Sequence, residues 1–479
     1  MVKSVVLVPG NFNILHPGHL RLLSFARECG DRLVVAVYSD RMAGKGALVP
    51  ERLRLEGVQS NSLVDEAFLI DEPIADFIVR LRPDIVVKGK EHEYAFNPEL
   101  QAIEQVGGRL LFSSGEAVFS SVDLLRKEFL SAGVRTIKLP SDYMARHGID
   151  VERLKTVLHG FAKIRLCVIG DLIVDEYITC QPLGMSQEDP TIVVTPIDST
   201  RFVGGAGIVA AHAAGMGAGN VQFVSVTGAD VPRDYARGEL DAAGVAVRFL
   251  VDDSRPTTLK QRYRCKGKTL LRVSHLHQGA ISTQLQAQLL AQMEEIIPSV
   301  DLIVFSDFNY GCLPQPVVDK ISSMAKSRGV MLAADSQSSS QIGDIGRFKG
   351  MDLLTPTEHE ARLATRNRED GLVVLAEGLR RDSGASNVLL KMGEEGLLVH
   401  AGNVGNDDWL TDRVDALNAA PRDVAGAGDS LLIASALTLA TGGNIWEAAC
   451  LGSLAAAVQV GRVGNTPLQR QELLRELSE

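Results

Sequence analysis

The sequence has few cysteines and none of the motifs in which cysteines work together. Six cysteines are scattered over 479 residues, with no Cys-x-x-Cys pair and no cluster of cysteine with histidine. The pattern therefore indicates neither a zinc site nor a disulfide framework. We interpret the six as reduced thiols that mostly pack in cores.

A surplus of positive charge is also missing. Lysine and arginine number 49 against 59 aspartates and glutamates, which gives a net charge of −10 and a pI of about 5.6. Binding to nucleic acid or to an anionic membrane without sequence preference needs a basic surface. We therefore expect neither as a partner, and any bound phosphate must meet local hydrogen-bond donors.

Long hydrophobic runs are absent as well. No uncharged stretch reaches the roughly 18 residues that a membrane span needs. The first apolar run is interrupted by Pro9-Gly10 and is too short for the core of a signal peptide. We therefore expect a cytoplasmic protein.

What the sequence does contain fits a globular protein with more than one domain. At about 150 residues per domain the chain has room for roughly two or three, and 45% hydrophobic residues supply their cores. Residues 5–10 and 164–170 begin alike, with an apolar run that ends at glycine. Strand-like and helix-like segments alternate after each, which predicts two α/β domains in tandem.

We divide the chain into residues 1–133 with a parallel doubly wound sheet, a connector helix at 134–163, and a second α/β domain at 164–479. The second domain has strand-rich stretches early, at 191–202 and 257–273. Early strands without helical partners commonly form a separate sheet. We expect this one to be a small lid over an active site.

The first chemical motif follows the first apolar run. Gly10-Asn-Phe12 leads into His16-Pro-Gly18-His19 at a predicted strand-to-helix turn. Glycine allows close backbone approach, and the N–H groups at a helix start favour anions. Two imidazoles three residues apart can donate hydrogen bonds to a nucleoside triphosphate during attack on its α-phosphorus. A lone histidine would more simply cap a helix or pack, but this pair after a glycine turn favours phosphate chemistry.

Residues 4–127 resemble the nucleotidyltransferases with the HxGH signature, in particular the adenylyltransferase half of the bifunctional ADP-heptose biosynthesis enzymes. The resemblance rests on GDRLVVAVYSD, the loop GKG, RPDIVVKGKEHE and the Ser-Ser segment that follows. It implies a Rossmann-like fold in which His16 and His19 hold the triphosphate. It also implies nucleotide or phosphate contacts from Gly10, Phe12, Gly18, Lys45, Lys88, Ser120, Ser121 and Arg126. Lys45 has the alternative of a solvated loop residue, and Ser120 that of a helix N-cap.

Asn13 departs from this family's pattern. The family usually has aspartate after the phenylalanine, so the chain lacks a carboxylate beside the triphosphate or its magnesium. An asparagine keeps a coordinating oxygen but not the charge. The change bears on metal affinity and rate in this half.

The second motif precedes an apolar helical segment near the C-terminus. Asp423-Val-Ala-Gly426-Ala427-Gly428-Asp429 leads directly into SLLIASALTLA. Small residues let N–H groups crowd around a transferred phosphoryl group, and a carboxylate beside them can take the proton from an attacking hydroxyl. Glycines before a helix can also serve a tight turn alone, but the added carboxylate favours kinase chemistry.

This DxxGAGD signature resembles the ribokinase-like (PfkB) carbohydrate kinases, and residues 164–470 look like the heptose-phosphate kinase half of the same bifunctional enzymes. Supporting stretches include GDLIVDEY, FVGGAGIVA, SDFNYGCL, LLTPTEHEA and KMGEEG. The resemblance implies that Asp429 is the general base. It implies an anion hole at Gly426, Ala427 and Gly428, sugar contacts from Asp175, Gly204 and Gly205, a Mg-ATP contact from Glu360, and an ATP site along Lys391, Gly393 and Gly396.

Some of these residues have ordinary alternatives. Arg262, Arg264 and Arg272 can form a solvated sheet face or grip the distal phosphate of the substrate, and the fit of guanidinium to phosphate favours the second. Asp175 has the alternative of a carboxylate in a surface turn, and Glu360 that of a charge on a helix surface.

Four positions in the second half depart from the family pattern. Ile208 replaces an asparagine, Tyr310 a lysine, Gln337 the lysine of a DPK-type stretch, and Thr357 the asparagine of a TPN-type motif. The base and the anion hole are retained. The pattern suggests an altered sugar, or a half that binds without strong turnover, rather than loss of the fold.

The resemblance as a whole implies a bifunctional transferase that uses ATP and Mg²⁺. One half would phosphorylate a sugar phosphate, expected to be heptose 7-phosphate at its anomeric hydroxyl. The other would join a sugar 1-phosphate to the nucleoside monophosphate of ATP and release pyrophosphate. The alternatives are a different sugar, CTP in place of ATP, or a kinase half that only binds a metabolite and regulates the transferase. The family places the kinase first, so the order here is reversed, and we expect a homodimer through the lid.

Overall fold

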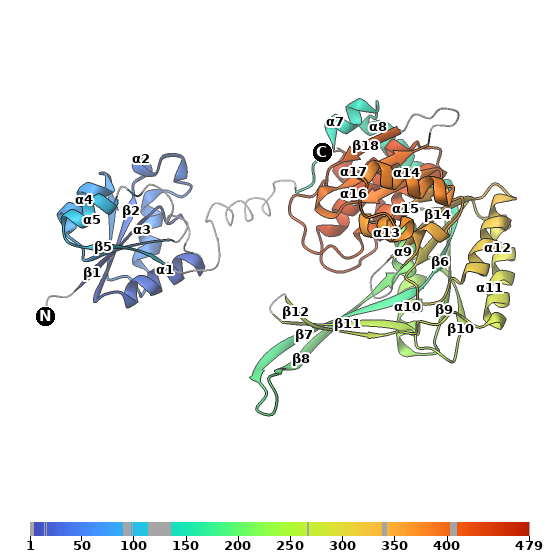
Figure 1. Ribbon diagram of the computed structural model, residues 1–479, viewed down its shortest axis with the longest axis horizontal. Helices are drawn as coiled ribbons and strands as arrows, with labels where there is room; N and C mark the ends of the chain where they lie inside the picture. The colour runs from blue at the N-terminus through green and yellow to red at the C-terminus, as the bar shows by residue number, and fades with distance from the viewer. Residues whose placement is uncertain are drawn as a thin grey trace. The chain divides into compact units, whose positions relative to one another are not determined.

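The computed structural model describes residues 4–13, 15, 17–89, 97, 99–113, 136–265, 268–337, 343–402 and 410–478. The chain divides into two compact units, Met1–Val134 and Arg135–Glu479, both drawn in Figure 1. Among the described residues, no helix combines the length and the apolar composition needed to cross a bilayer.

The first unit is built on a five-stranded parallel sheet in the order β3-β2-β1-β4-β5. The strands are β1 (Val5–Gly10), β2 (Arg32–Tyr38), β3 (Glu66–Ile70), β4 (Ile85–Gly89) and β5 (Arg109–Ser113). The chain steps outward from β1 in both directions, so the strand order reverses between β1 and β4. In open α/β sheets, ligands bind beyond the carboxyl ends of the strands at such a point.

Helices cover both faces of this sheet (Figure 1). They are α1 (Pro17–Glu28), α2 (Asp40–Ala43), α3 (Glu51–Gln59), α4 (Ile74–Leu81) and α5 (Glu99–Gln105). Successive side chains of a strand point to opposite faces. Accordingly, Val6 and Val8 lie in one buried cluster and Leu7 lies in the other. The predicted doubly wound α/β fold is confirmed.

The second unit contains a nine-stranded sheet in the order β10-β9-β6-β13-β14-β15-β16-β17-β18. The strands are β6 (Arg165–Gly170), β9 (Asn220–Thr227), β10 (Ala246–Val251), β13 (Leu302–Asp307), β14 (Met331–Ser336), β15 (Leu353–Leu354), β16 (Asn387–Lys391), β17 (Leu397–Ala401) and β18 (Leu410–Val414). All pairs from β10 to β16 are parallel, and β17 and β18 are antiparallel. The carboxyl ends of β6, β13, β14 and β16 therefore meet at one edge.

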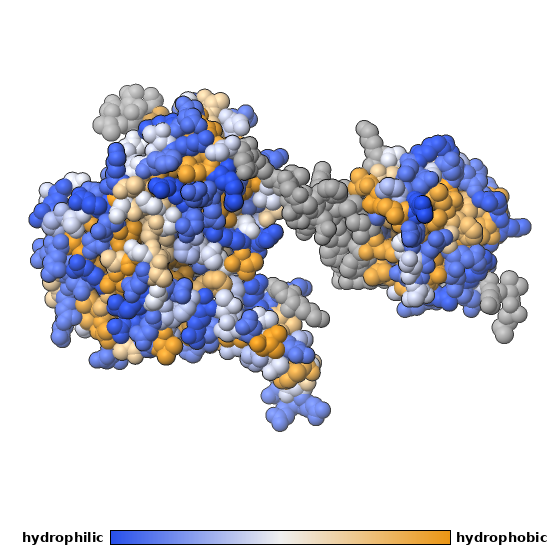
Figure 2. Space-filling view, turned by 180° about the vertical axis from the view of Figure 1, so that it is seen from behind, coloured by the Kyte–Doolittle hydropathy of each residue, from blue (hydrophilic) through white to orange (hydrophobic). Residues whose placement is uncertain are grey.

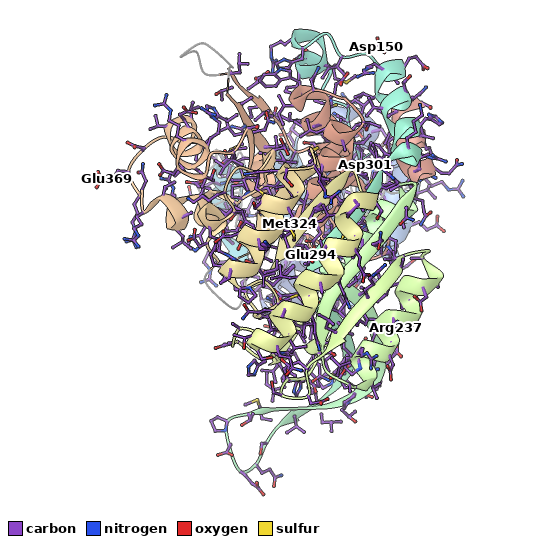
Figure 3. All side chains as sticks on the ribbon, turned by 90° about the vertical axis from the view of Figure 1, so that its right-hand side faces the viewer. Asp150, Arg237, Glu294, Asp301, Met324 and Glu369 are labelled. Carbon is purple, nitrogen blue, oxygen red and sulfur yellow. The ribbon has the colours of Figure 1, made fainter. Side chains whose placement is uncertain are left out.

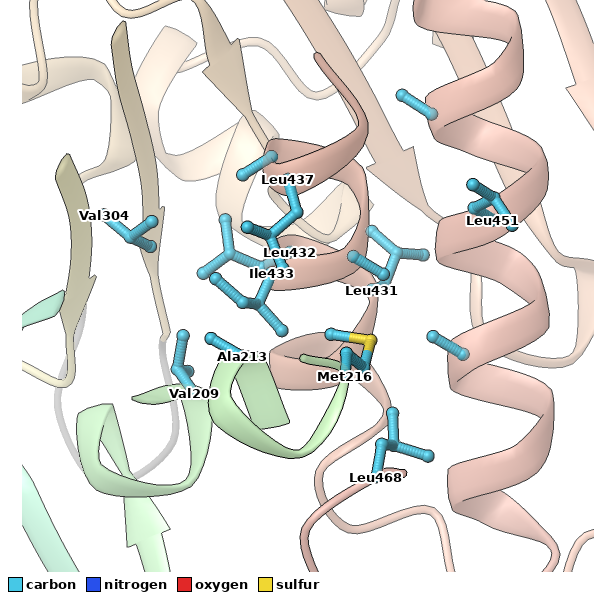
Figure 4. Close-up of a cluster of buried hydrophobic side chains, with 14 of the residues drawn as sticks. Val209, Ala213, Met216, Val304, Leu431, Leu432, Ile433, Leu437, Leu451 and Leu468 are labelled. Carbon is cyan, nitrogen blue, oxygen red and sulfur yellow. The ribbon is translucent and has the colours of Figure 1, made fainter. Parts of the chain in front are cut away.

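Helices also cover this sheet on both faces. They are α9 (Ala206–Gly215), α10 (Val231–Ala242), α11 (Thr283–Ile296), α12 (Gln315–Lys326), α13 (Glu358–Thr365), α14 (Leu372–Ser383), α15 (Ala427–Ala440), α16 (Ile445–Val460) and α17 (Arg470–Ser478). Figure 3 shows α11 and α12 side by side on one face, at the labels Glu294 and Met324. On the other face α15 packs between α9 and α16, and Figure 4 shows Val209, Ile433 and Leu451 in this core. A helix that is apolar on all sides must be buried in this way.

A second, four-stranded sheet projects from the unit (Figure 1). Its order is β12-β11-β7-β8, with β7 (Leu172–Met185), β8 (Ile192–Gly205), β11 (Thr258–Cys265) and β12 (Lys268–His275). The separate small sheet predicted from the sequence is therefore present. Only Asp171 separates β6 from β7, so this lid sheet begins at the carboxyl edge of the main sheet.

The segment before β6 carries two helices, so the prediction of one connector helix is wrong. They are α7 (Ser141–Arg146) and α8 (Val151–Gly160). Gly148, in the left-handed conformation at φ 61°, separates them, because such a glycine ends a helix. Both helices belong to the second unit and contact its helix α16: the Tyr143 hydroxyl donates to the Trp446 carbonyl at 3.1 Å, and Arg153 pairs with Glu447 at 2.7 Å.

Candidate active sites

The first candidate site lies at the carboxyl end of β1, beside β4. Helix α1 begins at Pro17, so Gly18 and His19 fall in its first turn. Phe12 is 3% exposed and left-handed at φ 49°, a costly conformation that clusters at functional sites. Its ring centroid lies 5.1 Å from that of His19, and a Cβ on Gly10 would come within 3.0 Å of the same phenyl ring. Phe12 thus packs against the imidazole at the helix start.

Asn13 ties the loop after β1 to the turn at Gly44–Gly46. Its Nδ2 donates to the Gly46 carbonyl at 2.8 Å. Its Oδ1 accepts from the N–H groups of Leu48 at 2.9 Å and Val49 at 3.3 Å. An ionised aspartate could accept these bonds but could not donate. The departure from the family pattern therefore has a structural reason, because this loop uses an amide.

Replacing Asn13 with aspartate is expected to destabilise the first unit. The carboxylate would face the Gly46 carbonyl with no donor between them, and an unsatisfied buried group costs about 1–3 kcal/mol. Thermal unfolding of the full chain should show a lower Tm for the first unit. Asn61→Asp is the matched control, because Oδ1 of Asn61 accepts a hydrogen bond from the N–H of Leu63, and an aspartate keeps this bond. Equal Tm values for the two variants at neutral pH would contradict the role given to the amide.

Arg54 holds the same loop in place. It is a buried arginine in a charged helix, and its burial could not be predicted from the sequence. Its guanidinium donates to the carbonyls of Asn11 and Val49 and pairs with Oδ1 of Asp40, each at 2.7 Å. The bond from Arg54 holds the pKa of Asp40 below its usual value. Arg54 is therefore a positioning residue for the backbone just before Phe12.

Lys88, which the resemblance predicts to contact phosphate, lies near the carboxyl end of β4. Its Nζ is 3.0 Å from Oε1 of Glu99 on α5, and both side chains are largely buried. A phosphate at this edge would share the ammonium with that carboxylate. The backbone of Lys45 lies in the turn at Gly44–Gly46. The remaining predicted contacts fall outside the described residues: His16, Ser120, Ser121 and Arg126.

The second candidate site is built at the start of α15. Gly426 precedes the helix in the left-handed conformation at φ 77°. A Cβ there would come within 2.2 Å of Oδ1 of Asn465, so the position requires glycine. Ala427 and Gly428 are the first two helical residues. The N–H groups at a helix start lack intrahelical acceptors and favour an anionic ligand.

Asp429 is the third residue of α15 and is 6% exposed. Its Oδ1 accepts a hydrogen bond of 2.8 Å from Nε2 of Gln337, which follows β14. Burial, together with the nearby carboxylate of Asp335, raises the pKa of Asp429 to about 7. A carboxyl that titrates near neutral pH is suited to take a proton from a hydroxyl.

Lys391, the last residue of β16, reaches the same place. Its Nζ lies 2.9 and 3.1 Å from the two carboxylate oxygens of Asp335. A Cβ on Gly428 would stand 3.2 Å from that Nζ. Burial alone would lower the pKa of Lys391, but the carboxylates of Asp335 and Glu360 hold it above its usual value. A charged ammonium therefore stands beside the start of α15.

Glu360 is held at the start of α13 by a capping box. Its carboxylate accepts from the N–H of Thr357 at 2.7 Å, and the Thr357 hydroxyl accepts from the N–H of Glu360 at 3.3 Å. The threonine that departs from the family pattern is thus the N-cap of this helix. Glu360 is 5% exposed, which excludes a charge on a helix surface. Gly393 and Gly396 flank the turn after β16, both at positive φ.

Mg²⁺ fits this donor set together with phosphate oxygens. The charges of Asp335, Glu360 and Asp429 all act on Lys391, and Asp335 contacts its ammonium. Within the described ranges, no group of three or more His, Cys, Asp or Glu residues could hold a metal by itself. Mg²⁺ is usually bound through one or two carboxylates plus substrate phosphates, and Glu360 suits that role.

Asp175 and the glycine pair meet where β7 and β8 join the main sheet. A Cβ on Gly204 would come within 2.5 Å of Oδ2 of Asp175, and one on Gly205, at φ 59°, within 2.4 Å of the Asp171 carbonyl. Asp175 is 7% exposed, so it is not in a surface turn, and its Oδ1 lies 3.3 Å from Arg262. Burial raises the pKa of Asp175, which Arg262 opposes.

The carboxyl charges of Asp175 and Asp429 act on each other. After burial and Asp335, the charge of Asp175 is a further cause of the raised pKa of Asp429, so the two carboxyls lie close enough to interact. Asp423 connects strand β7 to the loop after α16. Its carboxylate accepts hydrogen bonds from the Tyr177 hydroxyl at 3.3 Å and from the N–H of Gly464 at 3.1 Å. From the sequence, Asp423 is recognised only as the first residue of the DxxGAGD motif.

The three arginines lie on β11 and β12 of the lid sheet. The guanidinium carbons of Arg262 and Arg264 are each 5.2 Å from the ring centroid of Tyr177. Arg272 is exposed and stands opposite Arg262 in the strand register. Arg262 also contacts Asp175, so at least one of the three arginines lies beside the predicted sugar contacts.

Of the four residues that differ from the family pattern, two lie in the packed interior. Ile208 is fully buried in the main hydrophobic cluster. Tyr310 is also buried, and the Nζ of Lys260 lies 5.2 Å from its ring centroid. The backbone N–H of Tyr310 donates to Asp171, as does that of Phe308. Asp171, which the sequence does not mark, therefore fixes the loop after β13.

The two units match two different family models. Residues 163–471 match the pfkB family of carbohydrate kinases, and residues 7–111 match the cytidylyltransferase-like family. The chain therefore belongs to the pfkB family of carbohydrate kinases, with a cytidylyltransferase-like domain ahead of the kinase domain. This is the domain order predicted from the sequence.

Similar proteins include two described as bifunctional protein HldE. That of Desulfatibacillum aliphaticivorans is 29% identical over 67% of this chain and 64% of its own length. That of Shewanella baltica (strain OS185) is 30% identical over 68% of this chain and 66% of its own length. The chain thus matches slightly less than two thirds of each relative.

Solved structures with the same fold include two sugar kinases. Phosphofructokinase-2 from Escherichia coli superposes with a TM-score of 0.54 at 16% identity, over 66% of this chain and 99% of that one. Ribokinase from Thermotoga maritima superposes with a TM-score of 0.53 at 20% identity, over 66% of this chain and 100% of that one. These matches confirm the predicted ribokinase-like fold.

Proposed function

We propose that this chain is a bifunctional enzyme of nucleotide-sugar biosynthesis. The second unit phosphorylates a sugar phosphate with ATP, and its substrate is heptose 7-phosphate, which reacts through the anomeric hydroxyl. The first unit joins a sugar 1-phosphate to the nucleoside monophosphate of ATP and releases pyrophosphate. The similarity to HldE proteins supports the pairing of the two activities. Because ATP serves both steps, we place them in the cytoplasm.

The observation that carries the kinase proposal is the buried carboxyl of Asp429 at the start of α15, with Asp175 close by. In the reaction the hydroxyl oxygen attacks the γ-phosphorus, its proton passes to Asp429, and the bond to the bridging oxygen breaks as ADP leaves. The first N–H groups of α15 stabilise the charge on the transferred group. Asp175 and the glycine pair hold the sugar, and Glu360 would hold Mg²⁺, which neutralises phosphate charge.

In the transferase reaction, an oxygen of the sugar 1-phosphate attacks the α-phosphorus and pyrophosphate leaves. His16 and His19 donate hydrogen bonds to the triphosphate, and the start of α1 adds backbone N–H groups. The kinase product carries two phosphates, whereas the transferase takes a sugar 1-phosphate. A separate phosphatase must therefore act between the two steps.

Two screens test the proposal. Sugar 1-phosphates are incubated with ATP or CTP and pyrophosphate release is measured, and sugar 7-phosphates are incubated with ATP and ADP release is measured. We expect release with ATP in both. Pyrophosphate release with CTP alone would correct the nucleotide, an outcome that the cytidylyltransferase-like match favours. Absence of ADP release would identify the second unit as a metabolite-binding regulator, the alternative raised by the four positions that depart from the family pattern.

We further propose that the protein forms a homodimer through the lid sheet. Leu183 and Ile197, on the β7–β8 arm, are 63% and 62% exposed, and Figure 2 shows hydrophobic residues in orange along this arm. Exposed apolar groups of this kind mark interaction surfaces. Light scattering after size exclusion should give twice the chain mass of 51.5 kDa, and the single mass for Leu183→Asp/Ile197→Asp. A monomeric native protein would refute the proposal.

A further inference from the structure

The resemblance to the ribokinase-like kinases implies lysine at two positions of the second unit that carry other residues here. Position 310 is a buried tyrosine, and position 337 is a glutamine that donates to Asp429. A transferred phosphoryl group carries negative charge on its peripheral oxygens, and cationic groups at this place are a main source of stabilisation. The site therefore needs a cation from another position.

Lys391 supplies a cation at that place. Strands β14, β15 and β16 are neighbours and parallel, so their carboxyl ends meet at one edge. Asp335 lies at the end of β14, two residues before Gln337, and Lys391 ends β16. The lysine thus reaches across β15 to Asp335, with its Nζ 2.9 Å from the carboxylate. The same Nζ lies beside Gly428, where the first N–H groups of α15 converge.

We propose that Lys391 is the cation that meets the transferred phosphoryl group, in place of the lysine absent at position 337, and that Gln337 instead orients the carboxyl of Asp429. The inference rests on the proposed kinase activity. Asp335 holds the ammonium beside α15. The bond from Gln337 occupies Oδ1 of Asp429, which leaves Oδ2 to take the proton of the attacking hydroxyl.

The competing explanation is that Lys391 and Asp335 form an ion pair with a purely structural role. Moving the lysine to position 337 distinguishes the two explanations. Lys391→Met removes the ammonium and keeps the length of the side chain. We expect kcat for phosphoryl transfer to fall by about 10²- to 10³-fold, with the KM of the sugar phosphate unchanged. Adding Gln337→Lys should restore kcat by about tenfold or more, which is one well-placed interaction. Lys320→Met, on the exposed side of α12, is the matched control.

Two outcomes of this experiment would overturn the inference. One is a Lys391→Met protein with native kcat. The other is a double variant no more active than Lys391→Met alone, because a lysine at position 337 keeps a donor for Oδ1 of Asp429. The single variant leaves Asp335 without its partner and so risks loss of fold. Lys391→Met/Asp335→Asn removes that unpaired charge, and it should be folded, by its Tm, and equally impaired in kcat.

Nucleotide binding provides a readout that needs no sugar. An ammonium that meets the transferred group should matter for a β,γ-imido analogue of ATP and not for ADP. By calorimetry, Lys391→Met should weaken binding of the analogue by about tenfold and change that of ADP by less than about twofold. Equal changes for both nucleotides would overturn the inference. A native protein that binds the analogue but phosphorylates no sugar phosphate would instead refute the proposed activity, and the binding ratio would still decide the role of Lys391.

Discussion

Replacing Asp429 with asparagine is expected to lower kcat for phosphoryl transfer by about 10²- to 10⁴-fold, the contribution of a positioned general base. Asparagine keeps the Oδ1 that accepts from Gln337, so the local geometry and the binding of ATP should persist. Initial rates of ADP release give kcat, and calorimetry gives ATP affinity. Native rates of ADP release in Asp429→Asn would mean that the base is another residue.

The pH profile gives the same residue a second readout. The base must be ionised, and the pKa of Asp429 is raised to about 7 by burial and by Asp335. Kinase kcat/KM should therefore rise with pH up to about 7 and then level off, and this limb should be absent in Asp429→Asn.

The same pKa gives a control for folding. The folded pKa of Asp429 lies above the value of about 3.9 for an unfolded aspartate, so the native state binds the proton more tightly. The stability linked to that proton is present below the unfolded pKa and is lost as the pH rises through about 7. At pH 8, asparagine removes a buried charge, and the Tm of Asp429→Asn should be no lower than that of the native protein. Lost activity with a retained Tm then reports catalysis rather than unfolding.

These measurements also separate an enzyme from a regulator. If the native second unit binds ATP and a sugar phosphate but releases no ADP, there is no turnover for Asp429→Asn to lose. An effect of the sugar phosphate on pyrophosphate release by the first unit would then support regulation.

Replacing His19 with alanine is expected to lower kcat for pyrophosphate release by about 10²- to 10³-fold, the usual effect of removing one donor to transition-state charge. His19 lies in the first turn of α1 with its ring against Phe12, so the imidazole is held at the anion-binding end of the helix. A coupled assay with a sugar 1-phosphate and ATP measures the rate. His19→Asn, which keeps an N–H donor, should lose less.

Two controls accompany this variant. His159→Ala changes an exposed histidine of α8 and should leave pyrophosphate release unchanged. ADP release by the second unit should also be unchanged in His19→Ala, because each site is built within its own unit. Native pyrophosphate release by His19→Ala would overturn the assignment of this site.

The features that could be predicted from the sequence are local ones. Strand β1 and the start of α1 follow from an apolar run, Gly10, and a proline at the first helical position. The start of α15 follows in the same way from Gly426 and the apolar residues after it. The position of a strand and the start of a helix depend on residues a few positions apart, so both can be predicted without knowledge of the fold.

The partners of the charged residues could not be predicted in this way. In the sequence Gln337 is only a position where lysine is expected, yet its amide donates to Asp429, which lies 92 positions away. In the sequence Asn13 is only a position where a carboxylate is expected, yet its amide donates to the carbonyl of Gly46, which lies 33 positions away. In the sequence, such a substitution shows only the loss of a charged group. The hydrogen bond that the new side chain makes is seen only in the folded structure.

Two α/β units, each with a glycine turn at the start of a helix, can be predicted from the amino-acid sequence, because these features depend on short stretches of chain. Which charged side chains meet at those turns depends on how distant parts of the chain fold together. Lys391 and Asp335 are 56 positions apart and join because β14 and β16 run parallel on either side of β15. The pairing depends on strand order, which no local pattern in the sequence records.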